Sequence, residues 1–174
     1  QRMLMRLEEE LLARACPPMI ATVSEYVRRQ IFDTVPHFPP ERVAIVFNGV
    51  SIERLAPEIA APRRAELRSQ WQLAAPCPVL LLLGHNFRLK GLGELIHALA
   101  AAPLADIRPA LIVAGRDGAT EYARLARSVG VFEQIRFIGA STAPRDLYAA
   151  VDLLAHPTWY DPCSRVVLEA LTCG

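Results

Sequence analysis

The sequence predicts an α/β fold with a doubly wound parallel sheet of the Rossmann-like kind, in which helices cover both faces of the sheet. From residue 62 onward, apolar runs of four or five residues alternate with segments whose apolar residues recur every three or four positions. Continuous apolar runs are typical of parallel strands, because such strands are buried on both faces. The alternation of strand and helix supplies the crossovers that parallel strands need. The expected strands are Val79–Leu83, Ala110–Ala114, Ile135–Ile138 and Leu153–His156.

Amphipathic helices are expected before, between and after these strands. The clearest, from Leu92 to Leu99, has apolar residues at i, i+3, i+4 and i+7. Gly130 stands just past another helical pattern, where helices commonly end in a left-handed residue. The other helices are expected around Leu67 and Trp71, from Tyr122 to Val129, over Arg145–Val151 and from Pro162 to Gly174.

The first fifty residues have a different pattern. An amphipathic helix is expected over residues 2–15, and the apolar runs Met19–Val23 and Val43–Phe47 are interpreted as strands that lack neighbours of their own. Ser24 is a suitable N-cap for a helix between these strands. Residues 51–62 show no clear period, so we expect an interdomain linker there. Because the chain ends on a helix with no strand to follow, the sheet looks unfinished, and we expect a piece of a longer protein.

Composition and charge exclude several classes of protein. The 174 residues are 52% apolar and 21% charged, which excludes disorder as the main state. A net charge of +1 argues against nucleic acid as a partner, because such proteins gather a basic surplus on one face. The longest strongly aliphatic run is far short of a membrane span, and no signal peptide is visible. Four scattered cysteines without a Cys-x-x-Cys pair favour a reducing, cytoplasmic setting.

Polar residues and glycines follow the carboxyl ends of the predicted strands, where open parallel sheets bind ligands. The first of these loops, Gly84–Gly91, carries Arg88 and Lys90 just before a helix N-terminus. Two cations beside the free N–H groups of a helix suit a diphosphate, although a pair of solvated surface cations is the alternative. The loop lacks the Gly-Lys-Ser/Thr of a P-loop, and no Gly-x-Gly-x-x-Gly occurs, so binding of a nicotinamide dinucleotide is disfavoured.

Two carboxylates stand eight residues apart after the last predicted strand. Asp161-Pro162 has the residue types of an N-cap followed by a first helical residue. Glu169 interrupts an apolar run, so it lies either on the exposed strip of the last helix or in the crevice at the strand ends. Periodicity alone does not decide between the two.

The remaining candidates are expected to be structural. Cys163 falls in the first turn expected for the last helix, but no general base stands beside it in the sequence, so we expect it to pack. His85 and His156 each stand at the carboxyl end of a predicted strand and, with Asp161, are conceivable metal ligands. Because they lack metal-ligand spacing, hydrogen-bonding roles are favoured and no metal site is predicted.

Several short segments share one order and spacing along nearly the whole chain: Ala21–Glu25, Val46–Val50, Gly84–Gly91, Ile112–Gly115, Ile135–Gly139, His156–Asp161 and Leu168–Gly174. Each is weak alone. Together they resemble the retaining GT-B glycosyltransferases of the glycosyltransferase family 4 type, which use nucleotide-sugar donors. Within that group, Phe87–Gly91 and His156-Pro157 look most like the lipopolysaccharide core glucosyltransferases.

The resemblance implies catalytic and donor-binding roles for individual residues. In that family, the lysine of the Lys-Gly loop and a nearby arginine bind the donor diphosphate, which implies this role for Lys90 and Arg88. The carboxylate that ends the Glu-x7-Glu motif holds the ribose hydroxyls, here Glu169. The first carboxylate of the motif approaches the transferred sugar, here Asp161. The loop that binds the diphosphate opens at Gly84.

The same resemblance implies backbone contacts to the donor. Amides at the start of the last helix would touch the diphosphate, and the loop after the third predicted strand would face the base. The residues concerned are Ser164, Arg165, Val166, Ile138 and Gly139. This sequence departs from the family in two places. Asp161 replaces the usual glutamate and has a shorter reach, and Gly84-His85-Asn86 replaces the usual Gly-Arg-Leu, so Arg88 must supply the guanidinium group.

The resemblance also implies an organisation and an activity. Residues 1–50 would be the C-terminal tail of an acceptor-side N-terminal domain, and residues 63–174 a donor-binding domain truncated at its C-terminus. The complete enzyme would transfer a hexosyl group from a UDP or GDP sugar to a saccharide or lipid-linked acceptor, with lipopolysaccharide synthesis as one setting. It would need no metal or further cofactor and would lie in the cytoplasm, with peripheral contact at the inner face of the membrane. The fragment alone is expected to be inactive. The alternatives are a non-catalytic module that binds a nucleotide or nucleotide sugar, and a GT-B-type epimerase.

Overall fold

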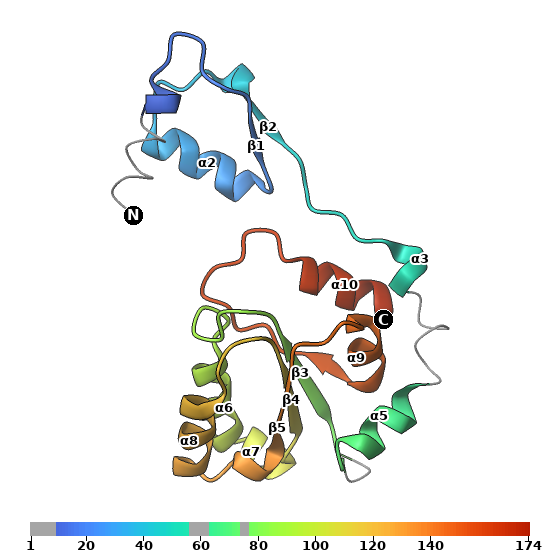
Figure 1. The fold of residues 1–174 in the computed structure, drawn as a ribbon. Coiled ribbons are helices and arrows are strands. Elements are labelled where there is room, and N and C mark those ends of the chain that lie inside the picture. Colours follow the sequence, from blue (N-terminus) through green and yellow to red (C-terminus); the bar gives the residue numbers. More distant parts are fainter. Residues whose placement is uncertain (1–9, 56–62, 74–76) are drawn as a thin grey trace. The chain divides into compact units, whose positions relative to one another are not determined.

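The computed structural model of the chain describes residues 10–55, 63–73 and 77–174 (Figure 1). The chain divides into two compact units. The smaller consists of Gln1–Gly49 with Pro162–Ser164, and the larger of Val50–Asp161 with Arg165–Gly174. Among the described residues, no helix is both long and apolar enough to cross a membrane.

The smaller unit contains a two-stranded parallel sheet and a helix. Strand β1 (Ile20–Thr22) pairs with β2 (Val43–Ile45), and α2 (Glu25–Thr34) connects them, followed by the 3-10 turn η1 (Pro40–Arg42). The expectation that these two strands lack neighbours of their own is therefore wrong, because each is the other's neighbour. Ser24 caps α2 as predicted, since its Oγ accepts a hydrogen bond from the Val27 N–H at 3.3 Å. Most of the helix expected over 2–15 lies outside the described residues.

The larger unit is built around a four-stranded parallel sheet with the strand order β5-β4-β3-β6 (Figure 1). Apolar side chains of β3 and β4 point alternately to the two faces and form two core clusters. One cluster packs against α6 and α8, and the other against α9 and α10. The elements in chain order are α3 (Ile52–Leu55), α5 (Arg64–Gln70), β3 (Val79–Leu83), α6 (Leu92–Ala100), α7 (Leu104–Ile107), β4 (Ala110–Ala114), α8 (Thr120–Ser128), η3 (Phe132–Gln134), β5 (Ile135–Gly139), α9 (Pro144–Ala150), β6 (Leu153–Leu154) and α10 (Arg165–Cys173).

Helices on both faces of a parallel sheet confirm the predicted doubly wound α/β fold. Strands β3 and β4 have the predicted bounds, and Gly130 follows the end of α8 with a φ of +78°. Strand β6 is two residues shorter than expected. After Ala155, whose N–H still donates to the Leu81 carbonyl, the chain leaves the sheet. Helix α7 was not expected. Within the linker expected over 51–62, α3 forms, and residues 56–62 lie outside the described part of the chain.

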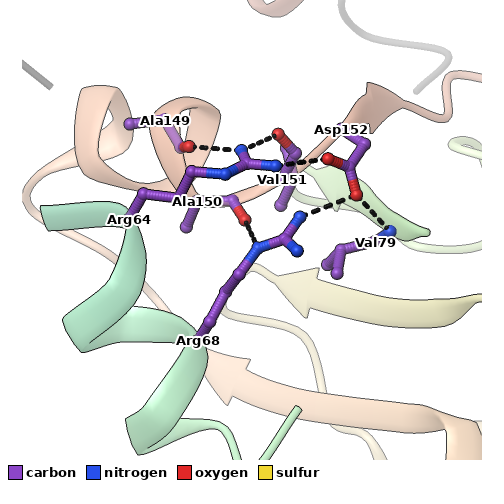
Figure 2. A network of polar contacts seen from close by, with 7 residues as sticks. All are labelled: Arg64, Arg68, Val79, Ala149, Ala150, Val151 and Asp152. Atoms are coloured by element: carbon purple, nitrogen blue, oxygen red, sulfur yellow. Dashed lines mark hydrogen bonds and ion pairs between the residues drawn. The ribbon is translucent and has the colours of Figure 1, made fainter. Parts of the chain in front are cut away.

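A polar network joins α5 to the end of α9 (Figure 2). The last carbonyls of a helix have no partner within it, and cations near them are favourable. Arg64 and Arg68 of α5 donate to these carbonyls, and both guanidinium groups also pair with Asp152, which follows the helix. The Asp152 carboxylate accepts the Val79 N–H at 2.8 Å, which ties the network to the first residue of β3. The carbonyls bound at 2.7 to 2.8 Å are those of Ala149, Ala150 and Val151.

Replacing Asp152 by asparagine should lower the free energy of unfolding at pH 7 by about 1–2 kcal/mol, since the partly exposed carboxylate makes charge-assisted hydrogen bonds. Burial acts to raise the pKa of Asp152, but the Val79 amide and the two arginines outweigh it and lower that pKa. The stabilisation is therefore present above the unfolded-state pKa, near about 4, and is lost as the pH falls through the lower folded-state pKa.

Urea denaturation of wild type and Asp152→Asn at pH 7 and pH 3 measures this difference. The two midpoints should converge at the acidic pH. The control Asp106→Asn alters an exposed carboxylate on α7 and should not change the midpoint at either pH. If Asp152→Asn lowers the free energy of unfolding as much at pH 3 as at pH 7, the ionised carboxylate is not the cause of the loss.

Candidate functional site

The strand order of the larger sheet marks one crevice as a binding position. From β3 the chain moves outward through β4 to β5, and then returns through α9 to β6 on the other side of β3. Ligands of open α/β sheets bind outside the carboxyl ends of the strands at such a topological switch point. Here the loop 84–91 after β3 and the loop 155–161 after β6 meet at that point.

The loop 84–91 is fixed by its own packing and hydrogen bonds. Phe87 is 2% exposed and meets Tyr122 edge to face, with ring centroids 5.8 Å apart. The Phe87 N–H donates to Asp117 Oδ2 at 2.6 Å, so the loop after β4 also holds it. Asn86 has a left-handed φ of +57°, and its side chain accepts the Leu89 N–H at 3.2 Å. The backbone that carries the two predicted cations is thus preorganised.

The loops after β3 and β6 are bound to each other. The Leu89 carbonyl accepts both the Trp159 N–H at 2.9 Å and the Thr158 hydroxyl at 3.1 Å. Gly91, with a φ of +73°, lies directly against Pro157, and a Cβ at this position would fall 2.1 Å from the Pro157 carbonyl oxygen. Only glycine fits this approach without a shift of the backbone.

Lys90 and Asp161 form an ion pair at the switch point. Lys90 Nζ lies 2.5 Å from Asp161 Oδ2, and the two side chains are 15% and 18% exposed. The lysine stem passes beside Gly84, where a Cβ would meet Lys90 Cε at 3.3 Å. His156 Nε2 lies 3.3 Å from the same aspartate oxygen. Burial, together with the nearby Lys90 charge, lowers the pKa of His156 despite the opposing effect of Asp161, so the imidazole is neutral at pH 7.

The prediction that Asp161 caps the last helix is wrong. Helix α10 begins at Arg165, three residues later than the cap position requires, and the Asp161 carboxylate binds Lys90 instead. A charge-assisted contact between two largely buried groups outweighs the local preference of an Asp-Pro pair for a helix start. His85, the other histidine at a strand end, accepts the Arg116 N–H through Nδ1 at 3.3 Å. In the described part of the chain, no group of three or more His, Cys, Asp or Glu side chains could hold a metal ion.

Glu169 lies on the side of α10 that faces α9. Its Oε2 accepts the Tyr148 hydroxyl at 2.9 Å, Arg165 lies 3.7 Å away, and the glutamate side chain is 16% exposed. Glu169 is therefore not on the exposed strip of the helix, which was one of the two positions that the sequence allowed. Burial and the adjacent Glu169 carboxylate raise the pKa of Tyr148. The phenol therefore stays protonated and donates a hydrogen bond to Glu169.

A hollow of about 460 Å³ opens beside Glu169. Residues after β5 and residues of α10 form its walls, so it lies on the same side of the sheet as the strand ends. Its size and its mixture of hydroxyl, guanidinium and carboxylate groups suit a polar ligand of several rings. The lining residues are Val50, Ser51, Thr142, Ala143, Pro144, Arg145, Arg165 and Glu169.

The structure does not bring Arg88 together with Lys90. Arg88 is exposed and lines a separate hollow of about 550 Å³ with Asn86, Leu89, Gly93, Glu94, Tyr122 and Trp159. Trp159 is 71% exposed, and its indole N–H donates to Glu94 Oε1 at 3.1 Å. The sequence did not indicate this hollow, nor the contacts of Tyr148 with Glu169 and of His156 with Asp161. Of these features, only the contact of His156 had a signal in the sequence, namely the position of this histidine at the carboxyl end of a predicted strand.

The remaining predicted residues lie near the strand ends or the start of α10. Ile138 packs against the core cluster on the α9 side, and Gly139 ends β5 with its carbonyl accepting the Gly115 N–H at 2.9 Å. Ser164 immediately precedes α10, Arg165 is its exposed first residue, and Val166 packs against the same cluster as Ile138.

Comparison with known proteins identifies relatives with similar sequences. The family model described as "Glycosyl transferases group 1" matches residues 63–174. The lipopolysaccharide glucosyltransferase WaaG of Escherichia coli (strain K12) is 32% identical over 149 residues, which are 84% of this chain and 40% of that protein. The D-inositol 3-phosphate glycosyltransferase of Thermobispora bispora is 32% identical over 183 residues, covering 97% of this chain and 41% of that protein. The chain thus spans less than half the length of these relatives.

Solved structures agree with the sequence comparison. The crystal structure of WaaG, a glycosyltransferase involved in lipopolysaccharide biosynthesis, superposes with a TM-score of 0.83 at 27% identity, covering 99% of this chain and 46% of that one. Anabaena Alr3699/HepE in complex with UDP and glucose gives a TM-score of 0.82 at 23% identity, covering 99% of this chain and 47% of that one. The fold is that of GT-B glycosyltransferases over the part of those structures that it covers. With its family match over residues 63–174, the chain belongs to the glycosyl transferases group 1 family.

Proposed function

We propose that the complete protein is a retaining, metal-independent hexosyltransferase, and that residues 63–174 hold its nucleoside-diphosphate sugar donor. The observation that carries the proposal is the position of the Lys90 ammonium group, which lies at the switch point of the sheet beside the Asp161 carboxylate. A diphosphate leaving group develops negative charge there, and a fixed cation stabilises that charge.

The other donor contacts follow from the positions of the side chains. Asp161, beside Lys90, approaches the transferred sugar. The amides at the start of α10, those of Ser164, Arg165 and Val166, bind the diphosphate, because a helix N-terminus favours anions. Arg88, which is exposed, is a second cation for the diphosphate.

The nucleoside occupies the hollow beside Glu169. The Glu169 carboxylate, held by Tyr148, binds the ribose hydroxyls. The base lies against the backbone at Ile138 and Gly139. In the complete enzyme, the acceptor attacks from the face that the nucleotide leaves, so the anomeric configuration is kept.

The relatives support the substrate class. WaaG is a lipopolysaccharide glucosyltransferase, and HepE was solved with UDP and with UDP-glucose. We therefore propose a UDP or GDP sugar as donor and a saccharide or lipid-linked acceptor, with residues 1–50 belonging to the acceptor-side domain and 51–62 to the linker. All four cysteines are free thiols, which supports a cytoplasmic setting.

Binding of UDP and GDP to the complete protein, measured by calorimetry, tests the donor site. One of them should bind, and Glu169→Gln should weaken that binding about 10- to 100-fold, because a charged acceptor for two hydroxyls is lost. Glu133→Gln, at an exposed position of η3, is the control and should bind like wild type. If neither nucleotide binds, or if both variants bind equally well, the donor site is not where we place it. A product with the donor's anomeric configuration then distinguishes a retaining transferase from a binding module and from an epimerase.

A further inference from the structure

A second hollow of the larger unit lies beside the proposed donor site and is almost unused by the proposed function. Its volume of about 550 Å³ is within the range of small-molecule sites in proteins. The lining residues are Asn86, Arg88, Leu89, Gly93, Glu94, Tyr122 and Trp159. Lys90, Asp161 and Glu169 are not among them, and only Arg88 has a role in the proposed donor site.

The wall of this hollow contains an indole ring that is held in place but not covered. The side-chain N–H of Trp159, at the edge of the ring, donates to Glu94 Oε1 at 3.1 Å, and its backbone N–H donates to the Leu89 carbonyl at 2.9 Å. The residue is nevertheless 71% exposed. An aromatic side chain buries roughly 150–250 Å² when it packs, so an uncovered one forgoes a large hydrophobic stabilisation. A fixed, uncovered aromatic ring beside a hollow is typical of a surface that binds a ligand.

The groups around the indole suit a sugar ring better than a purely apolar ligand. The face of an aromatic ring carries partial negative charge, so it attracts the polarised C–H groups on one side of a pyranose. The Glu94 carboxylate has about four acceptor positions, of which the indole N–H uses one, and the others can accept sugar hydroxyls. Tyr122, which is 9% exposed and packs against Phe87, anchors the hollow to the core.

The charges of the lining favour an uncharged saccharide. Among the residues that line the hollow, Arg88 supplies one positive charge and Glu94 one negative charge, so the two balance. A phosphorylated sugar is bound by a surplus of cationic groups, and anionic bilayers likewise attract basic clusters. The lining of this hollow has no such surplus.

The hollow adjoins the place where the sugar would be transferred. Arg88 precedes Lys90 by two positions in one loop, and Trp159 precedes Asp161 by two positions in the other. Two residues of chain span at most about 7 Å. A ligand in the hollow therefore lies next to the residues that we propose to act on the donor diphosphate and on the transferred sugar.

We propose that this hollow binds an uncharged sugar ring of the acceptor, stacked on the Trp159 indole with its hydroxyls bound to Glu94. The assignment of the ring to the acceptor rests on the proposed function, in which the donor nucleoside occupies the other hollow, beside Glu169. The binding of an uncharged sugar in itself rests only on the lining residues.

NMR of the complete protein tests this binding, with the uncharged methyl glycosides of glucose, galactose, mannose and N-acetylglucosamine as probes. At least one should bind at millimolar concentration and shift the indole N–H signal of Trp159, which is assigned by its loss in Trp159→Phe. Binding should persist in saturating UDP or GDP, because the donor site is separate. Glucose 6-phosphate should bind no more tightly than methyl glucoside.

Several outcomes of this titration would overturn the proposal. The first is that no probe moves the Trp159 signal. The second is that UDP or GDP displaces the bound glycoside, which would make the hollow a part of the donor site. The third is that the signal responds to vesicles of phosphatidylcholine or phosphatidylglycerol and not to the glycosides, which would make it a membrane contact. Tighter binding of glucose 6-phosphate would contradict the preference for an uncharged ring.

Variants separate stacking from a purely structural contact between Trp159 and Glu94. Trp159→Leu removes the aromatic face and should weaken binding of the glycoside about 10-fold, the equivalent of one good aromatic contact. Trp159→Phe also loses the bond to Glu94 but keeps an aromatic face, so it should bind within about threefold of wild type. Equal losses in the Leu and Phe variants would contradict stacking.

Glu94→Gln tests the polar side of the hollow. It should weaken binding of the glycoside about 10-fold, because hydrogen bonds to a charged acceptor are stronger than those to an amide. The matched control is Glu133→Gln, at an exposed position of η3, which should bind like wild type. Wild-type affinity in Glu94→Gln would remove the carboxylate from the site.

The two proposals fail separately. If a glycoside binds at Trp159 but neither UDP nor GDP binds the protein, the hollow remains a sugar site and the proposed function is wrong. If a nucleotide binds and sugar is transferred, but no glycoside contacts Trp159, the inference about this hollow is wrong and the donor site stands.

Discussion

Replacing Lys90 by alanine should lower the kcat of the complete enzyme about 100- to 1,000-fold. The ammonium group is held at the switch point by its ion pair with Asp161, so in the proposed mechanism it stabilises the leaving diphosphate without reorganisation. Removing one such preorganised group from an active site has effects of this size. Steady-state sugar transfer, measured with saturating donor, gives kcat directly.

Two arginine variants serve as comparisons for Lys90→Ala. Arg124→Ala changes an exposed cation of α8 and should transfer sugar at the wild-type rate. Arg88→Ala should have a smaller effect than Lys90→Ala, because Arg88 is exposed and lines a hollow whose walls include neither Lys90 nor Asp161. A near wild-type kcat in Lys90→Ala would remove this lysine from the mechanism and, with it, the main support for the proposed function.

Replacing Gly91 by alanine should lower the free energy of unfolding by about 3–5 kcal/mol. Two effects add: the left-handed backbone at Gly91 is unfavourable for alanine, and the new Cβ would lie 2.1 Å from the Pro157 carbonyl oxygen. That oxygen belongs to the backbone of a loop that is held by hydrogen bonds, so it cannot move aside without breaking them. Urea denaturation followed by circular dichroism measures the change.

Gly130→Ala separates these two effects. Gly130 has a nearly equal φ of +78°, but no atom lies within 4 Å of the position that its Cβ would take. Only the backbone strain remains there, and the expected loss is about 1–2 kcal/mol. If Gly91→Ala and Gly130→Ala lose equal stability, the close approach of the two loops in the structure is not a real constraint.

The central strands were predictable to the residue, whereas the ends of the later elements were not. Strands β3 and β4 are continuous apolar runs bounded by glycine or proline, so the hydrophobic pattern alone sets their limits. The start of α10 depends on Asp161, whose partner Lys90 lies 71 residues away in the sequence. Local helix-cap preferences cannot take account of such a partner, and so the predicted start was three residues too early.

In the candidate site, the residues themselves could be predicted from the sequence, whereas their partners could not. Lys90, Asp161 and Glu169 could be singled out because their residue types and their places after strands are visible in the sequence. Their partners could not, because Tyr148 reaches Glu169 only through the packing of α9 against α10. Arg88 and Lys90 stand two positions apart in one loop, yet Arg88 lines the hollow beside Trp159, whereas Lys90 binds Asp161.

The shared carbonyl of Leu89 has a consequence for engineering. This oxygen accepts hydrogen bonds from both Thr158 and Trp159, and Gly91 packs directly against Pro157. The two loops are therefore held together as one structural unit, although they are distant in the sequence. A chimera that imports either loop alone from a relative with different donor preference would place a foreign surface against its native counterpart. Transplanting specificity into this scaffold therefore requires both stretches, 84–91 and 155–161, to be exchanged as a pair.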